Sequence, residues 1–170
     1  WKWLLNPRFG LFNYLLSLLG IVGPNWLFDP KWAMPAIIMT SVWKDIGFVM
    51  VMFLAGLQSI PHEYYEAADL DGASSWQRLR YITLPLLSPT TFFVIIMLLI
   101  NSFQVFDQVW IMTEGGPAGA TMVLVEQIVK NAFSYSRMGY ASAMSWVLFA
   151  MVFVVTVIQN RFQQNWVTYD

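Results

Sequence analysis

The sequence has no cysteine, a single histidine and few charged residues. Only 11% of its 170 residues are Asp, Glu, Lys or Arg, and the formal net charge is −1. Without cysteine the chain can form no disulfide bond, thiolate nucleophile or cysteine-ligated metal site. The net charge is near zero and the sequence has no cluster of basic residues, so it gives no sign of a positively charged surface that would bind nucleic acid. Disulfide-rich domains, thiol enzymes and nucleic-acid-binding proteins are therefore excluded.

The sequence also lacks the common catalytic and phosphate-binding patterns. His62 is the only histidine, so there is no H-E-x-x-H metal motif, and there is no glycine-rich phosphate loop. Four of the ten carboxylates crowd into residues 63–71, and only Asp45 and Asp107 could pair inside a membrane. We therefore expect no catalytic residue and no metal site, and keep a membrane-embedded enzyme only as a distant alternative.

Apolar residues, by contrast, are abundant. They make up 58% of the chain and include nine Trp, thirteen Phe and ten Met, which is typical of a membrane protein. A helix needs about 20 apolar residues to cross a bilayer. We therefore predict an all-α, polytopic transmembrane protein with about three spans and additional interfacial helices. The predicted spans are residues 33–57, 88–107 and 138–160.

Residues 1–32 are predicted to form an external or interfacial segment. Their apolar run from Leu11 to Val22 is too short to cross a bilayer. It is either an interfacial helix or the remainder of a longer span. The chain begins with Trp1 and shows no cleavable leader, so we expect it to be the C-terminal part of a longer, truncated subunit.

The other connecting segments carry polar residues. Residues 108–137 are predicted to be an external loop with an amphipathic helix at the surface. The polar face of that helix would carry Glu126, Gln127, Lys130 and Asn131. Residues 161–170 are predicted to form a cytoplasmic tail, with Trp166 and Tyr169 at the membrane interface.

Residues 58–87 connect the first two predicted spans and are rich in helix-boundary signals. Ser59 and Pro61 predict a helix start, with serine as the cap and proline just inside. Gly72 predicts the end of that helix, because glycine adopts the left-handed conformation at little cost.

A second short helix is predicted after this glycine. Ser74 followed by Gln77 has the spacing of a capping box, and Leu84-Pro85 is expected to end the helix. The segment is therefore predicted to be a helix, a glycine bend and a second helix. Glu63, Glu66 and Asp69 would share one face of the first helix, where they could meet basic groups of a partner.

The spacing within this segment resembles the EAA loop of the permease subunits of ATP-binding-cassette importers. The match is Glu-Ala-Ala, three residues, Gly, nine residues, Ile, one residue and Leu-Pro. In that family the loop is cytoplasmic and docks into a groove of the ATPase subunit, where small alanines would allow close approach. The resemblance implies that 58–87 is an ATPase-coupling loop with contact residues Glu66, Ala67, Ala68, Gly72, Ile82, Leu84 and Pro85.

Two further patterns resemble the sugar-type members of this family. One is W-x-x-L-x-N-P-x-x-G-x-x-N, which ends at Asn13. The other is the turn Thr-Glu-Gly-Gly-Pro, which in the family belongs to an external loop that meets a soluble binding protein. The resemblance implies that Gly115, Gly116 and Pro117 contact that binding protein.

The outer end of the second predicted span is unusually polar. Amides and hydroxyls there could replace the water hydrogen bonds of a sugar-sized polyol, or could bond to neighbouring helices. The residue types leave both alternatives open. Maltose-type permeases line their substrate site from this region, so the resemblance implies a substrate path, although Val105 departs from the polar pattern. The candidates are Asn101, Ser102, Gln104, Val105 and Gln108.

Taken together, the resemblance implies a type I ABC importer permease fold and a multi-pass subunit in the cytoplasmic (inner) membrane of a bacterium or archaeon. The subunit would translocate a sugar or oligosaccharide delivered by an extracytoplasmic solute-binding protein. Its other expected partners are an ABC ATPase, a second permease subunit and lipid, with no nucleic acid. The chain would not be an enzyme and would bind no cofactor, because ATP-Mg would lie on the ATPase.

Alternatives remain for the cargo and for the chain itself. The same importer class could carry glycerol 3-phosphate or another polyol, for which Lys44 is the obvious basic residue, and Lys44 and Asp45 could equally mark the outer interface. A non-functional remnant is a third alternative. The orientation rests on the resemblance, since only Arg78, Arg80 and Arg161 of the nine basic residues would be cytoplasmic, against the positive-inside rule.

Overall fold

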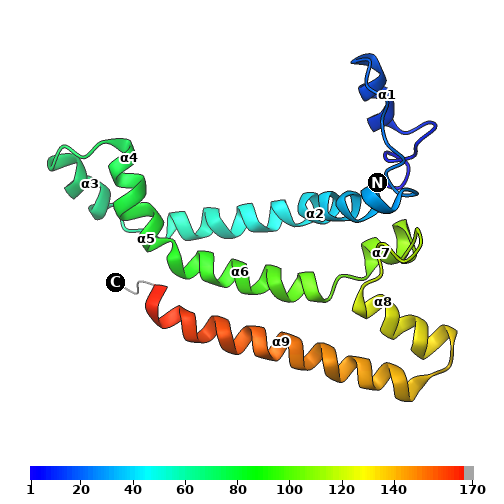
Figure 1. The fold of residues 1–170 in the computed structure, drawn as a ribbon. Helices are drawn as coiled ribbons and strands as arrows, with labels where there is room; N and C mark the ends of the chain where they lie inside the picture. Colours follow the sequence, from blue (N-terminus) through cyan, green and yellow to red (C-terminus); the bar gives the residue numbers. More distant parts are fainter. Residues whose placement is uncertain (167–170) are drawn as a thin grey trace. The chain divides into compact units, whose positions relative to one another are not determined.

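The computed structural model describes residues 1–166, with side chains as far as Arg161. Within those residues the regular structure is entirely helical (Figure 1). The chain divides into two compact units, one of Trp1–Asp45 with Ser102–Ala150, and one of Ile46–Asn101 with the residues from Met151 onward. The predicted position of Tyr169 lies outside the described residues.

Two helices of the described chain are long and apolar enough to cross a membrane. They are α2 (Pro30–Gln58) and the part of α9 (Met138–Trp166) that runs to Arg161. Only 11% and 6% of their most apolar windows are buried, so their side chains are available to lipid or to other protein surfaces. The predicted spans 33–57 and 138–160 fall within these helices.

A third crossing requires a bent pair of helical segments. α6 (Ser88–Phe103) has 16 residues, and it passes the same test only together with Ser75–Leu86, from which it is bent by 60°. The helix ends at Phe103, and α7 (Asp107–Met112) follows after a break. The described residues therefore contain two candidate spans, or three when the bent pair counts as one, in agreement with the predicted fold class.

The first unit has a small core near the N-terminus. Leu5, Leu27, Ala36 and Met112 are buried together. Trp26 packs against this core and meets Trp32 edge to face, with ring centroids 5.3 Å apart. α1 (Leu11–Leu18) has eight residues, too few to cross a bilayer, so the described segment is not itself a span.

Asn13 explains much of the N-P-x-x-G-x-x-N pattern. Its Nδ2 donates to the carbonyl oxygens of Pro7 and Pro24, both at 3.2 Å, and its Oδ1 accepts from Trp26 Nε1 at 2.7 Å. Gly10 is needed beside it, because a Cβ there would lie 2.4 Å from the carbonyl oxygen of Asn6. The pattern thus closes the N-terminal segment through side-chain-to-backbone bonds.

Asn13→Ala is expected to loosen this segment, because the change leaves two carbonyls and an indole N–H without their partner. We expect a loss of about 2 kcal/mol in stability, and an unfolding midpoint lower by roughly 4–8 °C, measured by tryptophan fluorescence in detergent. The control is Ser17→Ala, which removes one exposed hydroxyl bonded to Tyr14 O at 2.7 Å. Equal midpoints for the two variants would contradict the role of Asn13.

Candidate functional site: the helix–glycine–helix loop

The first helix of the predicted coupling loop begins later than the sequence indicated. α3 spans Glu63–Leu70 and has His62 at its N-cap, without a side-chain cap bond. Ser59 does not start it. Its hydroxyl instead donates to Gly56 O at 2.7 Å, at the end of α2. The predicted Ser59 cap was therefore wrong, because this hydroxyl satisfies a carbonyl that the end of a helix leaves open.

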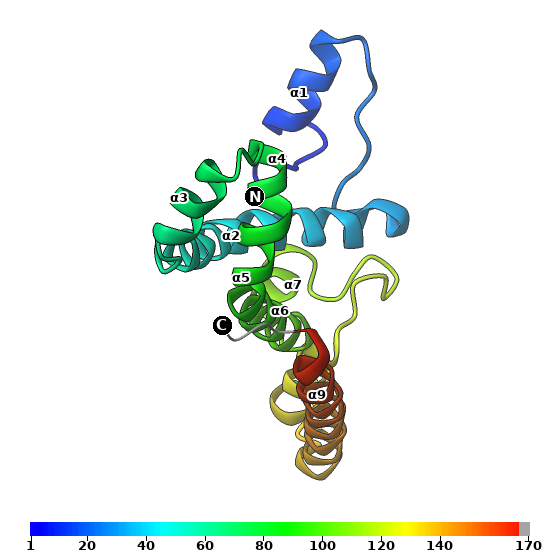
Figure 2. The same ribbon diagram turned by 90° about the vertical axis from the view of Figure 1, so that its left-hand side faces the viewer.

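The glycine bend and the second helix start are confirmed. Gly72 has a φ of +74°, which favours glycine. Ser74 and Gln77 form the predicted capping box at the start of α4 (Ser75–Arg78), with Ser74 N–H donating to Gln77 Oε1 at 2.7 Å. In Figures 1 and 2, α3 and α4 lie beside each other on either side of this bend.

Pro85 does not end the second helix, which corrects the expectation from sequence. A π-helical segment, Leu79–Thr83, continues directly from α4, and α5 (Leu84–Leu86) continues from that segment. A proline lies at the first positions of α5. The wide π turn accommodates it, because proline lacks an N–H and its ring would meet the carbonyl of an ordinary preceding turn.

Two side-chain contacts join the helices of this loop. Arg78 Nη1 donates to Asp69 Oδ1 at 2.6 Å, and the hydroxyls of Tyr65 and Thr83 lie 3.0 Å apart. Ala68 is buried, so its methyl group is not available to a partner, unlike that of exposed Ala67. These contacts hold α3 against the helical segment that follows the bend, so the loop has a defined structure of its own.

The surface of the loop combines several exposed acidic side chains with large apolar ones. Glu66 is exposed and accepts from His62 Nδ1 at 3.0 Å, whereas Asp69 is already paired with Arg78. Leu70 is 91% exposed, and Trp76 and Tyr81 are 69% and 71% exposed. Large exposed aromatic and aliphatic side chains of this kind are typical of a protein-binding surface.

The remaining predicted coupling residues differ in their accessibility. Leu84 is 54% exposed, whereas Ile82 and Pro85 are half-buried. Nothing lies within 4 Å of the position a Cβ on Gly72 would take, so this glycine is required by its φ and not by crowding. The glycine therefore sets the shape of the bend, while Glu66, Ala67 and Leu84 offer side chains to a partner.

The predicted substrate-path residues lie on successive elements. Asn101 and Ser102 are exposed near the end of α6, Gln104 and Val105 are in the break, and Gln108 is in the first turn of α7. In the part of the chain that the structure describes, the side chains of these four polar residues make no hydrogen bond. Their donors and acceptors are therefore open to another molecule.

The Gly-Gly-Pro turn lies between α7 and α8 (Leu124–Val129). Gly115 is buried, whereas Gly116 and Pro117 are half-buried. The sequence did not show how the backbone of this turn is held. Over residues 1–161, no group of three His, Asp or Glu side chains could hold a metal ion.

Comparison with known proteins assigns the chain to a family. A family model described as binding-protein-dependent transport system inner membrane component matches residues 3–167. The chain is 40% identical over 168 residues to the trehalose/maltose transport system permease protein of Thermococcus litoralis, which covers 97% of the chain and 57% of that protein. It is 38% identical over 171 residues to the sn-glycerol-3-phosphate transport system permease protein of Brucella abortus, covering 100% of the chain and 58% of that protein.

A solved structure has the same fold. A chain of a bacterial alginate ABC transporter, in complex with an alginate pentasaccharide-bound periplasmic protein, superposes with a TM-score of 0.86 at 27% identity. The match covers 96% of the chain and 57% of that structure, so the chain spans a little over half the length of its relatives. The chain belongs to the family of binding-protein-dependent transport system inner membrane components.

Proposed function

We propose that this chain is part of the permease subunit of an ATP-driven importer for a sugar or oligosaccharide. The observation that carries the proposal is the helix–glycine–helix loop between α2 and α6. Its two helical arms are joined by side-chain contacts, and its residue spacing resembles that of an ATPase-coupling loop, in a chain that belongs to this family. The proposed partners are an ABC ATPase, a second permease subunit, an extracytoplasmic solute-binding protein and inner-membrane lipid. ATP-Mg would be bound and hydrolysed on the ATPase.

The geometry of the loop supports a mechanical role. The Asp69–Arg78 and Tyr65–Thr83 contacts link the two helical arms of the loop. A displacement of α3 would therefore also displace α4, and would not merely change the angle of the bend at Gly72. The helical path from Ser75 to Leu86 then continues to Ser88, where α6 begins. ATP-driven closure of the partner would thereby move the adjoining apolar helices and change access to the substrate path.

A sugar is the proposed cargo. The relatives include a trehalose/maltose transport system permease protein, and the similar solved transporter imports the acidic polysaccharide alginate. The open amides and hydroxyls of Asn101, Ser102, Gln104 and Gln108 suit a polyol, which must exchange its water hydrogen bonds for protein ones.

The test is uptake by proteoliposomes that contain the full-length subunit, its second permease subunit and its ATPase. We expect uptake of radiolabelled maltose, trehalose or a longer glucoside from this set only when ATP is enclosed and the solute-binding protein is added outside. Glycerol 3-phosphate is offered in parallel. Uptake of every tested sugar without the ATPase, or uptake of none of the solutes by the complete set, would overturn the proposal.

The relative that transports glycerol 3-phosphate supports a second cargo, and Lys44 is the residue that distinguishes it. Lys44 is exposed on α2 and forms no ion pair within the described residues. If the cargo is a phosphate ester, Lys44→Gln is expected to lower its uptake about tenfold or more, since a charge-assisted contact is lost. With a neutral sugar, the same variant is expected to keep uptake within about twofold.

A further inference from the structure

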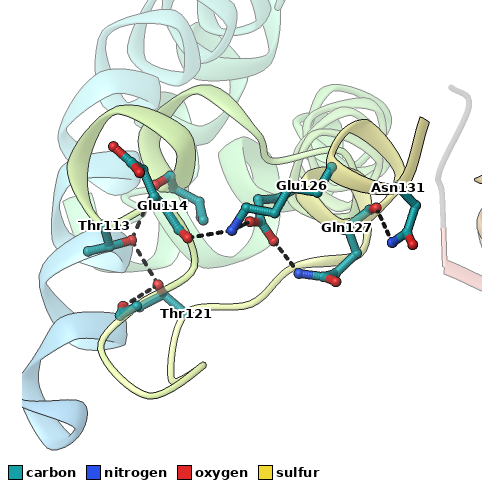
Figure 3. Close-up of polar contacts among 9 residues, drawn as sticks. Thr113, Glu114, Thr121, Glu126, Gln127 and Asn131 are labelled. Atoms are coloured by element: carbon teal, nitrogen blue, oxygen red, sulfur yellow. Dashed lines mark hydrogen bonds and ion pairs between the residues drawn. The ribbon is translucent and has the colours of Figure 1, made fainter. Parts of the chain in front are cut away.

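Glu126 is a buried carboxylate that the proposed transport mechanism does not use. Its side chain is 0% exposed on α8, although sequence placed it on the water-facing side of that helix. Lys130 forms an ion pair with it, and Gln127 Nε2 donates to its Oε2 at 2.7 Å (Figure 3). A buried charge has to be paired in this way to be tolerated.

The ion pair also contacts the Gly-Gly-Pro turn. Lys130 Nζ donates to the backbone carbonyl of Glu114 at 2.7 Å (Figure 3). On the same side, Glu126 lies against Gly115, where a Cβ would be only 3.0 Å from Glu126 Oε1. Gly115 has a φ of +83°, which favours glycine, and the nearby carboxylate leaves little room for a Cβ.

A second set of contacts holds the turn from its other end. Thr121 is fully buried, and its hydroxyl donates to Gly116 O at 2.6 Å. The Thr113 hydroxyl lies 2.7 Å from the same oxygen of Thr121. Glu114 and Gly116 are thus each held through their backbone carbonyl oxygens. These contacts do not use the side chain of Glu114, which stays available to a docking partner.

The backbone of this turn needs such support. Glu114 and Ala118 have φ values of 52° and 47°, in the left-handed region that side chains other than glycine rarely adopt. Conformations of this kind persist only where surrounding contacts enforce them, and they gather at functional sites. Lys130 supplies one of these contacts, to the carbonyl of Glu114, and the ion pair with Glu126 holds its ammonium group in place.

We propose that Glu126 and Lys130 are positioning residues that hold the 114–117 turn in the one backbone shape that docks the solute-binding protein. This inference rests on the proposed function. The pair does not touch the binding protein. It removes the entropic cost of ordering the turn on docking, so its loss weakens docking without altering the later steps of ATP-driven transport.

The test uses the complete importer in nanodiscs and its fluorescently labelled solute-binding protein. Glu126→Gln is expected to raise the Kd of that protein about tenfold, while ATP hydrolysis at saturating binding protein stays within about twofold. The matched control is Asp107→Asn, which makes the same acid-to-amide change at an exposed position of α7, outside the 114–117 turn. This control is expected to keep the wild-type Kd to within about twofold.

A double variant separates positioning from simple stability. Glu126→Met with Lys130→Met replaces a buried ion pair by apolar side chains, a change that is often neutral or stabilising. It is expected to fold and assemble like the wild type yet to show the raised Kd, because Glu114 O has lost its donor. A nitroxide spin label on Ala118→Cys, in a sequence with no other cysteine among these 170 residues, is expected to become more mobile.

The outcomes are distinct. An unchanged Kd and label mobility in the double variant would overturn the positioning role, whether or not Glu126→Gln folds. If the wild-type importer itself does not bind any solute-binding protein, the proposed function fails, and this inference fails with it. Loss of ATP hydrolysis together with docking in the folded double variant would also overturn the inference, because the effect would not be confined to the turn.

Discussion

Glu66→Lys is expected to release the ATPase subunit from the full-length permease. Glu66 is exposed on α3 and stands at the acidic position of the proposed coupling surface. Reversal of its charge would place like charges together at the proposed interface and would remove the contact that the Glu66 carboxylate makes with His62 Nδ1 at 3.0 Å. Loss of a charge pair within an interface costs a few kcal/mol, so we expect binding to weaken by about 30-fold or more.

The measurement is co-purification of the ATPase with the tagged permease in detergent, at increasing ATPase concentration. Glu114→Lys is the control, because it makes the same change on the turn between α7 and α8 and is expected to retain the ATPase. Size-exclusion chromatography of the permease shows whether each variant stays folded. An ATPase that binds the Glu66→Lys permease as tightly as the wild type would contradict the assignment of the loop.

Gly56→Ala is expected to be the most damaging methyl addition within α2. A Cβ at Gly56 would lie 2.6 Å from Thr90 Oγ1 and 3.0 Å from Leu87 Cδ2, so α2 and α6 approach each other there without room for a side chain. Overpacking of this kind costs roughly 1–3 kcal/mol. We also expect transport to fall, because these helix ends carry the loop.

Gly47 provides a matched control for this change on the same helix. Nothing lies within 4 Å of the position its Cβ would take, so Gly47→Ala gains helix propensity without a clash. Thermal unfolding in detergent should therefore separate the two variants by several degrees. Equal unfolding midpoints would mean that the close contact of Gly56 with Thr90 is not important for stability.

Local signals in the loop were readable from sequence because they depend on neighbouring residues alone. The left-handed Gly72 and the Ser74–Gln77 capping box depend on a few consecutive residues, and both are confirmed. The predicted Ser59 cap and the predicted helix end at Pro85 were wrong because such local signals are compatible with more than one structure. A serine near a helix boundary serves the end of one helix as readily as the start of the next, and a π turn can accommodate a proline.

The role of Glu126 could not be read from the sequence. Glutamate and lysine four residues apart are typical of an exposed helix surface, which is how they were interpreted. In the structure Glu126 and Asn131 are buried, whereas Phe133 is 74% exposed. The polar side of α8 is covered because it packs against the turn at Glu114 and Gly115, a contact between segments that no local periodicity encodes.

The most direct test of the account is site-specific photo-crosslinking in the assembled importer. A photoreactive amino acid is placed at Leu70, which is 91% exposed on the loop, or at Ala118, which is exposed directly after the Gly-Gly-Pro turn. We predict that the probe at Leu70 captures the ATPase and the probe at Ala118 captures the solute-binding protein. Capture of the solute-binding protein at Leu70, or of the ATPase at Ala118, would reverse the orientation and contradict the coupling role of the loop.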